Sequence, residues 1–321
     1  MKFKPILVVA GEPNSVFLEI FFKSIKTIKI KNPIILICSK TLFLLQSKAL
    51  NKKIKFKLVS NSDIFENKVD NKIVNLLDID LSVKKPFNKI SNKYNDYIEK
   101  CFNTALKLIG KGISYKLING PISKKHFLQK KFLGVTEYLA KKTNTKKYAM
   151  LIYNKKLSVC PVTTHLPVRQ IHNKITQKEV INKVILINIF FKKYFNFCPN
   201  IALTGLNPHC ESANGINEDE KILSPTIKKL NKLKYKITGP FAADTLFMKK
   251  NRDKFNVIVG MYHDQVLTPI KTLFEYDAIN ITLGLPFIRV SPDHGPNEKM
   301  LGKNLSSPLS LIRAIEFLDK N

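Results

Sequence analysis

Short apolar runs alternate along the first third of the chain with longer segments whose apolar residues recur at helical spacing. Pro5–Ala10 and Pro33–Ser39 are almost entirely apolar, so we expect two buried strands there. A helix is predicted between them, running through Ile25. Asn92–Gly110 repeats apolar residues at helical spacing and predicts an amphipathic helix. The next apolar run, Ser114–Ile118, predicts a third strand.

The second half of the chain continues this alternation. A helix is predicted over Gln177–Phe195, with Thr176 at its N-cap and Glu179 at the capping-box position. The tail Pro308–Leu318 is amphipathic. Residues 61–90 are charged and rich in Asn, and we expect them to form a surface excursion. Further buried strands are predicted at Leu157–Thr163, Asn200–Thr204 and Asn256–Gly260.

Strands that alternate with helices predict an α/β fold with a largely parallel sheet. The length of 321 residues predicts two domains. The longest apolar runs, such as Val184–Phe191, are far shorter than the ~20 residues that span a bilayer. The first apolar run, Ile6–Ala10, is too short for a secretory signal, and no small-residue cleavage site follows it. We therefore expect neither a membrane protein nor a secreted one.

The chain is strongly basic, with 54 Lys and Arg against 24 Asp and Glu and a formal net charge of +30. The lysines are scattered among many Asn, Ile and Phe residues, all of which have AT-rich codons, so genome composition is a sufficient cause. Because no nucleic-acid-binding motif accompanies the charge, we expect no specific nucleic-acid partner. A basic surface that attracts an anionic substrate stays open. The five cysteines are dispersed without C-x-x-C spacing, which favours a reduced, cytoplasmic chain.

Three histidines occupy equivalent places in this pattern. His165, His209 and His263 each follow an apolar run at its carboxyl end, where open α/β sheets bind ligands. Imidazoles from three loops, with positions left open, are typical of a catalytic metal site. Asp244 and Asp264 are candidate carboxylates for ligation or for orienting a ligand. The alternative is that each histidine is a structural residue, because no single helix or hairpin forces the three together.

A second group of polar residues lies between Tyr262 and Gly295. Lys271 and Arg289 can hold a phosphate or a carboxylate, and Asn280 can bond a hydroxyl or an anion. The alternative is that these side chains lie on a solvated face. No G-x-G-x-x-G or Walker A sequence occurs, so the standard dinucleotide fingerprint is absent.

Several longer motifs run in one order over nearly the whole chain: GEP, NGPISK, GVTEYLA, VTTHLPVR, GLNPH, GPFAADTLF, YHDQVLTPIKTL, NITLGLPFIRVSPDHG and MLGK. With these motifs the sequence resembles the 4-hydroxythreonine-4-phosphate dehydrogenase family of pyridoxal 5′-phosphate biosynthesis. The resemblance implies an α/β fold like that of the isocitrate and isopropylmalate dehydrogenases, with two α/β/α domains and a central cleft. We expect residues 1–118 and 275–321 to form the first domain and residues 119–274 the second.

The reaction that the resemblance implies uses NAD or NADP to oxidise the 3-hydroxyl of 4-phosphooxy-L-threonine. Loss of CO₂ from the product then gives 3-amino-2-oxopropyl phosphate. The resemblance also implies one divalent cation (Zn, Mg, Mn or Co) and a cytoplasmic homodimer whose active site is shared between subunits.

The resemblance assigns roles to individual residues. The family's metal ligands match the three strand-end histidines. Either Lys271 or Asp244 would move the proton, and the sequence does not choose between them. By analogy with related decarboxylating dehydrogenases, His294, Gly295 and Asn297 would contact the nucleotide. The family's substrate contacts match Thr136, Lys271, Asn280 and Arg289.

The chain departs from the family pattern at one substrate contact. Val135 replaces a histidine that the family presents toward the substrate, and Lys130 or Lys131 is an alternative source of that contact. Two further hypotheses follow. The same chemistry could act on a sister substrate such as 4-phospho-D-threonate or 4-phospho-D-erythronate. The chain could instead be a drifted homologue with low activity.

Overall fold

The computed structural model describes residues 4–129, 131–211 and 217–321. The chain divides into two compact units, which we describe separately. Unit 1 contains Met1–Tyr138 and Pro286–Asn321, and unit 2 contains Leu139–Leu285. The chain therefore passes from unit 1 to unit 2 between Tyr138 and Leu139, and returns to unit 1 between Leu285 and Pro286. The domain boundaries predicted from the sequence, 118/119 and 274/275, stay a prediction about separate folding domains.

Unit 1 is built on parallel strands in the order β3-β4-β2-β1-β5-β12. Strands of a parallel sheet are covered on both faces and are accordingly apolar throughout, and all four residues of β1 are buried. This explains why the first apolar runs could be identified as strands. The bounds are β1 (Ile6–Val9), β2 (Ile34–Cys38), β3 (Phe56–Val59), β4 (Val74–Asp78), β5 (Lys116–Asn119) and β12 (Ile288–Pro292).

The strand β4 corrects the expectation for residues 61–90. Val74–Leu77 are buried, and β4 lies between β2 and β3 instead of on a surface excursion. Its one buried polar residue is accommodated by hydrogen bonds, because the Asn75 side-chain amide donates to the carbonyls of Ile34 (3.0 Å) and Asp70 (2.7 Å). The surrounding Lys and Asn residues conceal this short buried strand in the sequence.

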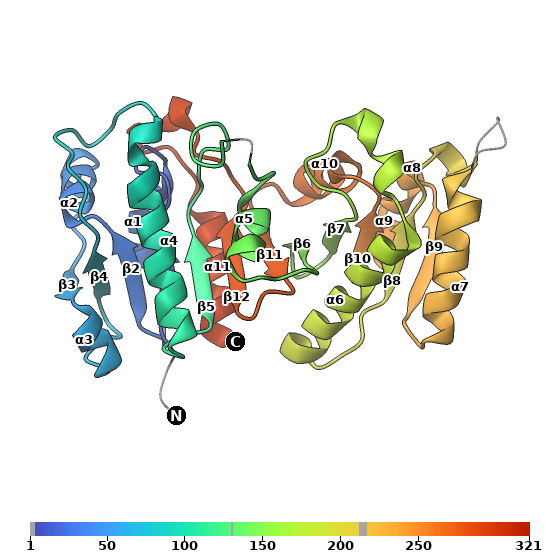
Figure 1. The fold of residues 1–321 in the computed structure, drawn as a ribbon, viewed down its shortest axis with the longest axis horizontal. Helices are drawn as coiled ribbons and strands as arrows, with labels where there is room; N and C mark the ends of the chain where they lie inside the picture. The colour runs from blue at the N-terminus through green and yellow to red at the C-terminus, as the bar shows by residue number, and fades with distance from the viewer. Residues whose placement is uncertain (1–3, 130, 212–216) are drawn as a thin grey trace. The chain divides into compact units, whose positions relative to one another are not determined.

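Helices cover both faces of the unit 1 strands. Figure 1 shows α4 in front of the strands and α11 behind them. The predicted helix at Asn92–Gly110 is confirmed as a 3₁₀ turn, η1, followed by α4, and the amphipathic tail forms α11. The bounds are α1 (Phe17–Thr27), α2 (Lys40–Ala49), α3 (Asn61–Phe65), η1 (Asn92–Tyr94), α4 (Asn95–Gly110), η6 (Glu298–Met300) and α11 (Leu309–Lys320). The helix α5 (Val135–Lys142) spans the 138/139 boundary.

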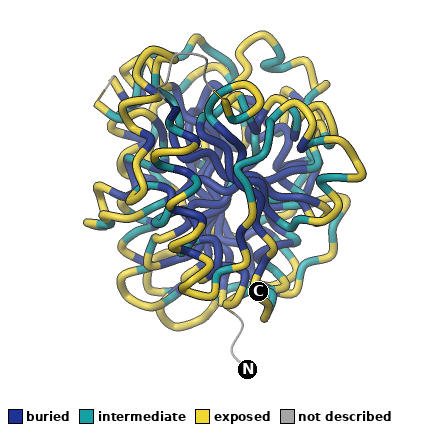
Figure 2. The backbone as a smooth tube through the Cα atoms, turned by 90° about the vertical axis from the view of Figure 1, so that its right-hand side faces the viewer, coloured by how far each residue is buried: buried dark blue, intermediate teal, exposed yellow. Residues whose placement is uncertain are grey.

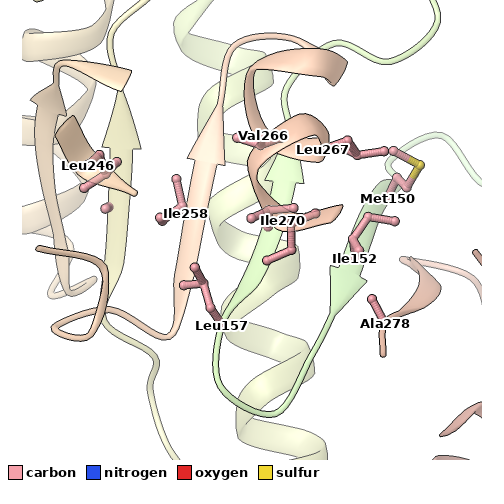
Figure 3. Close-up of a cluster of buried hydrophobic side chains, with 11 residues drawn as sticks. Met150, Ile152, Leu157, Leu246, Ile258, Val266, Leu267, Ile270 and Ala278 are labelled. Atoms are coloured by element: carbon pink, nitrogen blue, oxygen red, sulfur yellow. The ribbon is translucent and has the colours of Figure 1, made fainter. Parts of the chain in front are cut away.

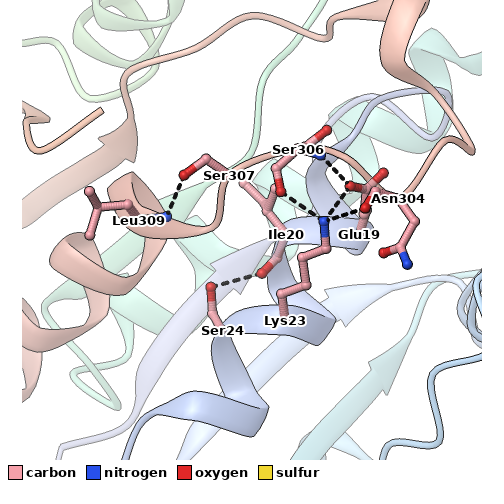
Figure 4. Close-up of polar contacts among 8 residues, drawn as sticks. All are labelled: Glu19, Ile20, Lys23, Ser24, Asn304, Ser306, Ser307 and Leu309. Atoms are coloured by element: carbon pink, nitrogen blue, oxygen red, sulfur yellow. Dashed lines mark hydrogen bonds and ion pairs between the residues drawn. The ribbon is translucent and has the colours of Figure 1, made fainter. Parts of the chain in front are cut away.

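The segment before α11 is bonded to α1 by a charge pair of a buried glutamate and a partly buried lysine (Figure 4). Lys23 Nζ donates to Glu19 Oε1 (2.9 Å) and to the carbonyls of Asn304 (2.9 Å) and Ser306 (2.8 Å). The Ser306 amide also donates to Glu19 Oε1 (2.7 Å). The Glu19 side chain is only 3% exposed, and the ammonium group of Lys23 compensates its buried negative charge.

Unit 2 has a mixed sheet in the order β11-β6-β7-β10-β8-β9. The strands β7, β10, β8 and β9 are parallel to one another, whereas β6 is antiparallel to both of its neighbours, β7 and β11. The predicted strands at Leu157–Thr163, Asn200–Thr204 and Asn256–Gly260 are confirmed as β7, β8 and β10. The bounds are β6 (Ala149–Tyr153), β7 (Ser158–Pro161), β8 (Ile201–Thr204), β9 (Ile237–Phe241), β10 (Val257–Gly260) and β11 (Ile279–Leu283).

The helices of unit 2 pack on both faces of these strands. Figure 3 shows α10 placing Val266, Leu267 and Ile270 against the strand residues Ile152 and Ile258, with α6 on the far side. The bounds of α6 are as predicted, and Thr176 Oγ1 accepts from the Glu179 amide (3.2 Å) at its N-cap. The helices and turns are η2 (Val168–Gln170), η3 (His172–Lys174), α6 (Gln177–Phe195), η4 (Pro208–Cys210), η5 (Asp219–Leu223), α7 (Ser224–Lys232), α8 (Ala243–Leu246), α9 (Lys249–Arg252) and α10 (His263–Phe274).

The burial pattern agrees with this layered arrangement. Figure 2 shows dark blue, buried backbone along the strands, with the exposed residues on the outer helix faces and connecting loops. Among the residues that the structure describes, no helix combines the length and apolar character needed to cross a membrane.

Candidate active site

The three predicted metal ligands leave the same end of neighbouring strands in unit 2. The strand β10 lies between β7 and β8 and is parallel to both. His165 follows β7, His209 follows β8, and His263 begins α10 shortly after β10. Carboxyl ends of neighbouring parallel strands share one edge of a sheet, which is the usual ligand edge of an α/β fold. The topology therefore gives a common edge to the loops that the sequence analysis singled out.

Two of the three imidazoles lie close together. The ring centroids of His165 and His263 are 5.3 Å apart, with an interplanar angle of 41°. His263 Nδ1 is 2.6 Å from Asp264 Oδ1. When Nδ1 carries the proton and donates to this carboxylate, the Nε2 lone pair of His263 stays available to a ligand.

His209 lies in the exposed turn η4 with a positive φ of 54°. Within the part of the chain that the structure describes, no three His, Cys, Asp or Glu side chains form a group that could hold a metal ion. The side chains as they stand thus bring together His165 and His263, and the role of His209 as a third ligand stays a prediction.

A buried carboxylate holds the loop that leads to His209. Asp219 is 1% exposed and accepts from the amides of Leu206 (2.8 Å) and Asn207 (3.1 Å) and from Asn207 Nδ2 (2.9 Å). A Cβ added at Gly205 would lie 2.6 Å from Cys210 Sγ and 2.7 Å from Asp219 Oδ1, so a larger residue there would displace these side chains. The sequence analysis missed Asp219, because its only signal is an acidic run from Glu218 to Glu220.

In unit 1, Arg289 provides a buried positive charge. It lies on β12, is 2% exposed, and donates from Nε to Asn119 Oδ1 (2.6 Å). Burial lowers the pKa of the Arg289 guanidinium to about 10, while the negative charge of Glu137 acts to raise it. The guanidinium therefore stays protonated at neutral pH. Burial also lowers the pKa of Lys124, again opposed by Glu137. Two cations around one carboxylate attract an anion.

Asn119 and Lys124 belong to the NGPISK segment, for which the sequence analysis gave no substrate role. Thr136, from the predicted substrate set, is buried at the first turn of α5 and 8% exposed. The replacement Val135 precedes it and is partly buried. Lys131 is exposed, and Lys130 lies outside the described residues.

The other residues predicted for the active site differ in exposure, hydrogen bonding and backbone conformation. Lys271 on α10 and Asp244 on α8 are both exposed. Asn280 on β11 has a buried Oδ1 that finds no hydrogen-bond partner among the residues described. His294 Nδ1 lies 2.9 Å from the Gly295 carbonyl, and Asn297 adopts the left-handed conformation. Nothing in these positions chooses Lys271 over Asp244 as the proton carrier.

A groove of about 340 Å³ opens elsewhere on unit 1. It is lined by apolar and polar residues from the end of α1, the start of β2 and the segment that leads into β4, among them Ile25, Ile28 and Lys72. None of the predicted site residues lines this groove.

Glu12 is a buried carboxyl group at the carboxyl end of β1, and it gives a pH-dependent prediction. Burial raises the pKa of Glu12 from 4.5 to about 7, and the charge of Glu298 adds to this. Between these values the folded chain binds more protons than the unfolded chain, so the free energy of unfolding falls as pH rises. Glu12→Gln should abolish this loss and raise the unfolding free energy at pH 8 by about 1–3 kcal/mol.

Urea unfolding of wild type and Glu12→Gln at pH 5 and pH 8 measures this effect. Glu66→Gln, at an exposed glutamate, is the matched control and should leave the pH dependence unchanged. Equal pH dependence in Glu12→Gln and wild type would show that the Glu12 carboxyl is ionised in the folded chain at neutral pH.

Comparison with known proteins agrees with the motifs. The family model described as pyridoxal phosphate biosynthetic protein PdxA matches residues 29–318. A 4-hydroxythreonine-4-phosphate dehydrogenase from Sulfurihydrogenibium sp. is 36% identical over 322 residues, covering 97% of this chain and 96% of the relative. A D-threonate 4-phosphate dehydrogenase from Salmonella typhimurium is 30% identical over 303 residues, covering 92% of each.

Solved structures agree with the fold. A 4-hydroxythreonine-4-phosphate dehydrogenase from Klebsiella pneumoniae matches with a TM-score of 0.83 at 28% identity, covering 98% of this chain and 97% of that chain. A β-decarboxylating dehydrogenase from Thermococcus kodakarensis matches with a TM-score of 0.50 at 11% identity, covering 98% and 82%, which shows the fold alone. The predicted α/β fold of the isocitrate and isopropylmalate dehydrogenase type is confirmed.

These relatives are dehydrogenases on a shared α/β fold, and the chain is accordingly an oxidoreductase. It belongs to the pyridoxal phosphate biosynthetic protein PdxA family, as the motifs predicted.

Proposed function

We propose that this protein oxidises the 3-hydroxyl of 4-phosphooxy-L-threonine with NAD or NADP, and that loss of CO₂ gives 3-amino-2-oxopropyl phosphate. The observation that carries the proposal is a buried, protonated Arg289, bonded to Asn119, at a position that matches a family substrate contact. A buried guanidinium is suited to bidentate binding of a phosphate or carboxylate. The full-length similarity to a relative of this name supports the choice of substrate.

A divalent cation fits the donor set of unit 2. Imidazole nitrogen is a ligand for Zn²⁺ and Co²⁺ and is accepted by Mn²⁺ and Mg²⁺ less readily. His165 and His263 are close together, and the bond from His263 to Asp264 leaves Nε2 for a ligand. His165, His209 and His263 would hold the cation. Such a cation, when bound, supplies Lewis-acid polarisation of the substrate's hydroxyl and keto oxygens.

The chain's own residues would bind and orient the substrate. Arg289, Lys271 and Asn280 hold the phosphate or carboxylate, with Thr136 as a further contact. Lys271 or Asp244 takes the proton from the 3-hydroxyl. NAD or NADP, when bound, would supply the hydride acceptor, because no side chain accepts a hydride. The loop with His294, Gly295 and Asn297 would contact the nucleotide. We further propose a cytoplasmic homodimer with a shared active site.

A sister substrate is the second candidate, because Val135 stands where the family has a histidine. The D-threonate 4-phosphate dehydrogenase among the relatives supports the same chemistry on 4-phospho-D-threonate or 4-phospho-D-erythronate. The deciding experiment assays the purified protein on all three phosphorylated acids, each with NAD and NADP, by following reduced-cofactor absorbance. Turnover of none of the three would contradict both candidates and favour a drifted homologue.

Val135→His should raise kcat/KM on 4-phosphooxy-L-threonine. Valine cannot hydrogen-bond through its side chain, and a net hydrogen bond contributes about 0.5–1.5 kcal/mol, or about 1.5–3 when one partner is charged. The expected gain is therefore roughly a few-fold to a hundredfold. Val168→His, at an exposed valine, is a matched control. A fall in kcat/KM on this substrate, with wild type preferring another acid, would establish the sister substrate instead.

A further inference from the structure

The Gln265 side chain joins three backbone segments near the histidine loops. Its Oε1 accepts from Thr204 Oγ1 (2.8 Å) and from the Met261 amide (2.7 Å). Its Nε2 donates to the Gly205 carbonyl (2.8 Å). Thr204 ends β8, Gly205 begins the loop to His209, and Met261 follows β10. One amide therefore ties the end of β8 to the end of β10, beside the first turn of α10.

Thr163 extends this connection to the third loop. Its amide (3.1 Å) and its Oγ1 (2.7 Å) both donate to the Met261 carbonyl. Met261 is thus bonded on one side to the loop that carries His165 and on the other to Gln265. All these contacts lie within unit 2.

The packing around Gln265 leaves little room for another arrangement. A Cβ added at Gly260 would lie 3.1 Å from Gln265 Oε1 and 2.3 Å from Val266 Cγ1. A primary amide also supplies what the three partners need, since its oxygen accepts twice while its nitrogen donates. A carboxylate lacks the donor, and an apolar side chain of equal length lacks all three bonds.

We propose that Gln265 is a positioning residue that fixes the loops of His165, His209 and His263 relative to one another, and thereby sets the affinity for a divalent cation. This inference rests on the proposed metal site. Asp219 independently holds Leu206 and Asn207, so loss of Gln265 leaves the loop anchored further along. The expected consequence is misplaced ligands in a folded chain.

Titration calorimetry of the metal-free protein with Zn²⁺ tests this. Gln265→Met keeps the side-chain length and removes the three bonds, and it should raise the dissociation constant by roughly 10–100-fold, the range found when groups that orient metal ligands are lost. Thr163→Val removes one bond and should give a smaller increase. Thr268→Ala, at an exposed position on the same helix, should leave the constant unchanged. The melting temperature of the metal-free protein should fall in Gln265→Met and less in Thr163→Val, because buried partners lose their hydrogen bonds, and stay at the wild-type value in Thr268→Ala; each titration is made below the melting temperature of its variant.

The outcomes separate this inference from the proposed function. If Gln265→Met binds Zn²⁺ as tightly as wild type, the inference is overturned and the metal site stands. If wild type binds no Zn²⁺, the proposed metal site is wrong, and so is the proposed effect of Gln265 on the affinity for a cation. Amide hydrogen exchange then tests the connection alone: it should be faster at Gly205 and Met261 in Gln265→Met, and unchanged exchange overturns the connection as well. Should Gln265→Met not fold, Thr204→Val removes the bond from Thr204 Oγ1 to Gln265 Oε1 and makes the comparison in its place, and an unchanged dissociation constant in that variant overturns the inference.

Discussion

Replacing His209 with Ala, or removing metal with a chelator, is expected to reduce dehydrogenase turnover by about a thousandfold or more. A Lewis-acidic cation supplies several kcal/mol of transition-state stabilisation, and each 1.36 kcal/mol is about tenfold in rate. His209 is an exposed residue of the turn η4, so the substitution removes the proposed ligand without removing core packing. The chain should therefore stay folded while its turnover is lost.

The measurement is kcat on 4-phosphooxy-L-threonine in metal-free buffer, followed by addition of Zn²⁺, Mn²⁺, Co²⁺ or Mg²⁺. Wild type should recover part of its activity with one or more of these ions, and His209→Ala should not. His172→Ala, at another exposed histidine of unit 2, is the matched control and should behave as wild type. Full activity in exhaustively metal-free protein would exclude metal chemistry.

The place of the histidine loops could be predicted because it depends on local pattern. Buried parallel strands are continuous apolar runs, so the carboxyl ends of β7, β8 and β10 are visible in the sequence. Each run is followed by a histidine, and the parallel order β7-β10-β8 then gives the three loops one edge. The family motifs supplied the roles that spacing alone could not.

The groups that hold the histidine loops in unit 2, and the group that holds Arg289 in unit 1, could not be predicted in the same way. Asp219, Gln265 and Asn119 act through hydrogen bonds to residues distant in the chain or to loop backbone, and such bonds depend on tertiary packing that no periodicity encodes. The strand β4 was not predicted for a related reason. Asn75 and the charged residues around it make the segment look polar in the sequence, and the hydrogen bonds that allow Asn75 to be buried form only in the folded chain.

Arg289→Met is expected to lower kcat/KM by roughly 30- to 5,000-fold. The substitution keeps an unbranched apolar stem and removes a buried cation that bonds Asn119. Loss of one partner of a buried, hydrogen-bonded charge pair with the substrate costs about 2–5 kcal/mol. Arg289→Lys keeps the charge but loses the planar, bidentate donor arrangement, so it should recover only part of the activity. Melting temperatures of both variants separate a loss of binding from a loss of folding.

Asn119→Leu separates the orientation of Arg289 from its charge. The substitution keeps the branched side-chain shape and the guanidinium, and it removes the acceptor that holds Nε at 2.6 Å together with the bond from Asn119 Nδ2 to the Gly120 carbonyl. A hydrogen bond to a charged group contributes about 1.5–3 kcal/mol, so kcat/KM should fall by roughly 10- to 150-fold. The loss should appear mainly in KM if Arg289 only binds the substrate, and in kcat as well if Arg289 aligns the 3-hydroxyl for hydride transfer.

The same variants identify which anion Arg289 holds. If it holds the phosphate, Arg289→Met should lose its penalty on 4-hydroxythreonine, which lacks that group, and added inorganic phosphite should stimulate wild type more than the variant on this substrate. If it holds the carboxylate, the penalty should be equal on both substrates. Wild-type kcat/KM in Arg289→Met and Asn119→Leu would remove Arg289 from the substrate site, because a buried cation that binds the anion cannot be replaced by a neutral side chain without loss of affinity.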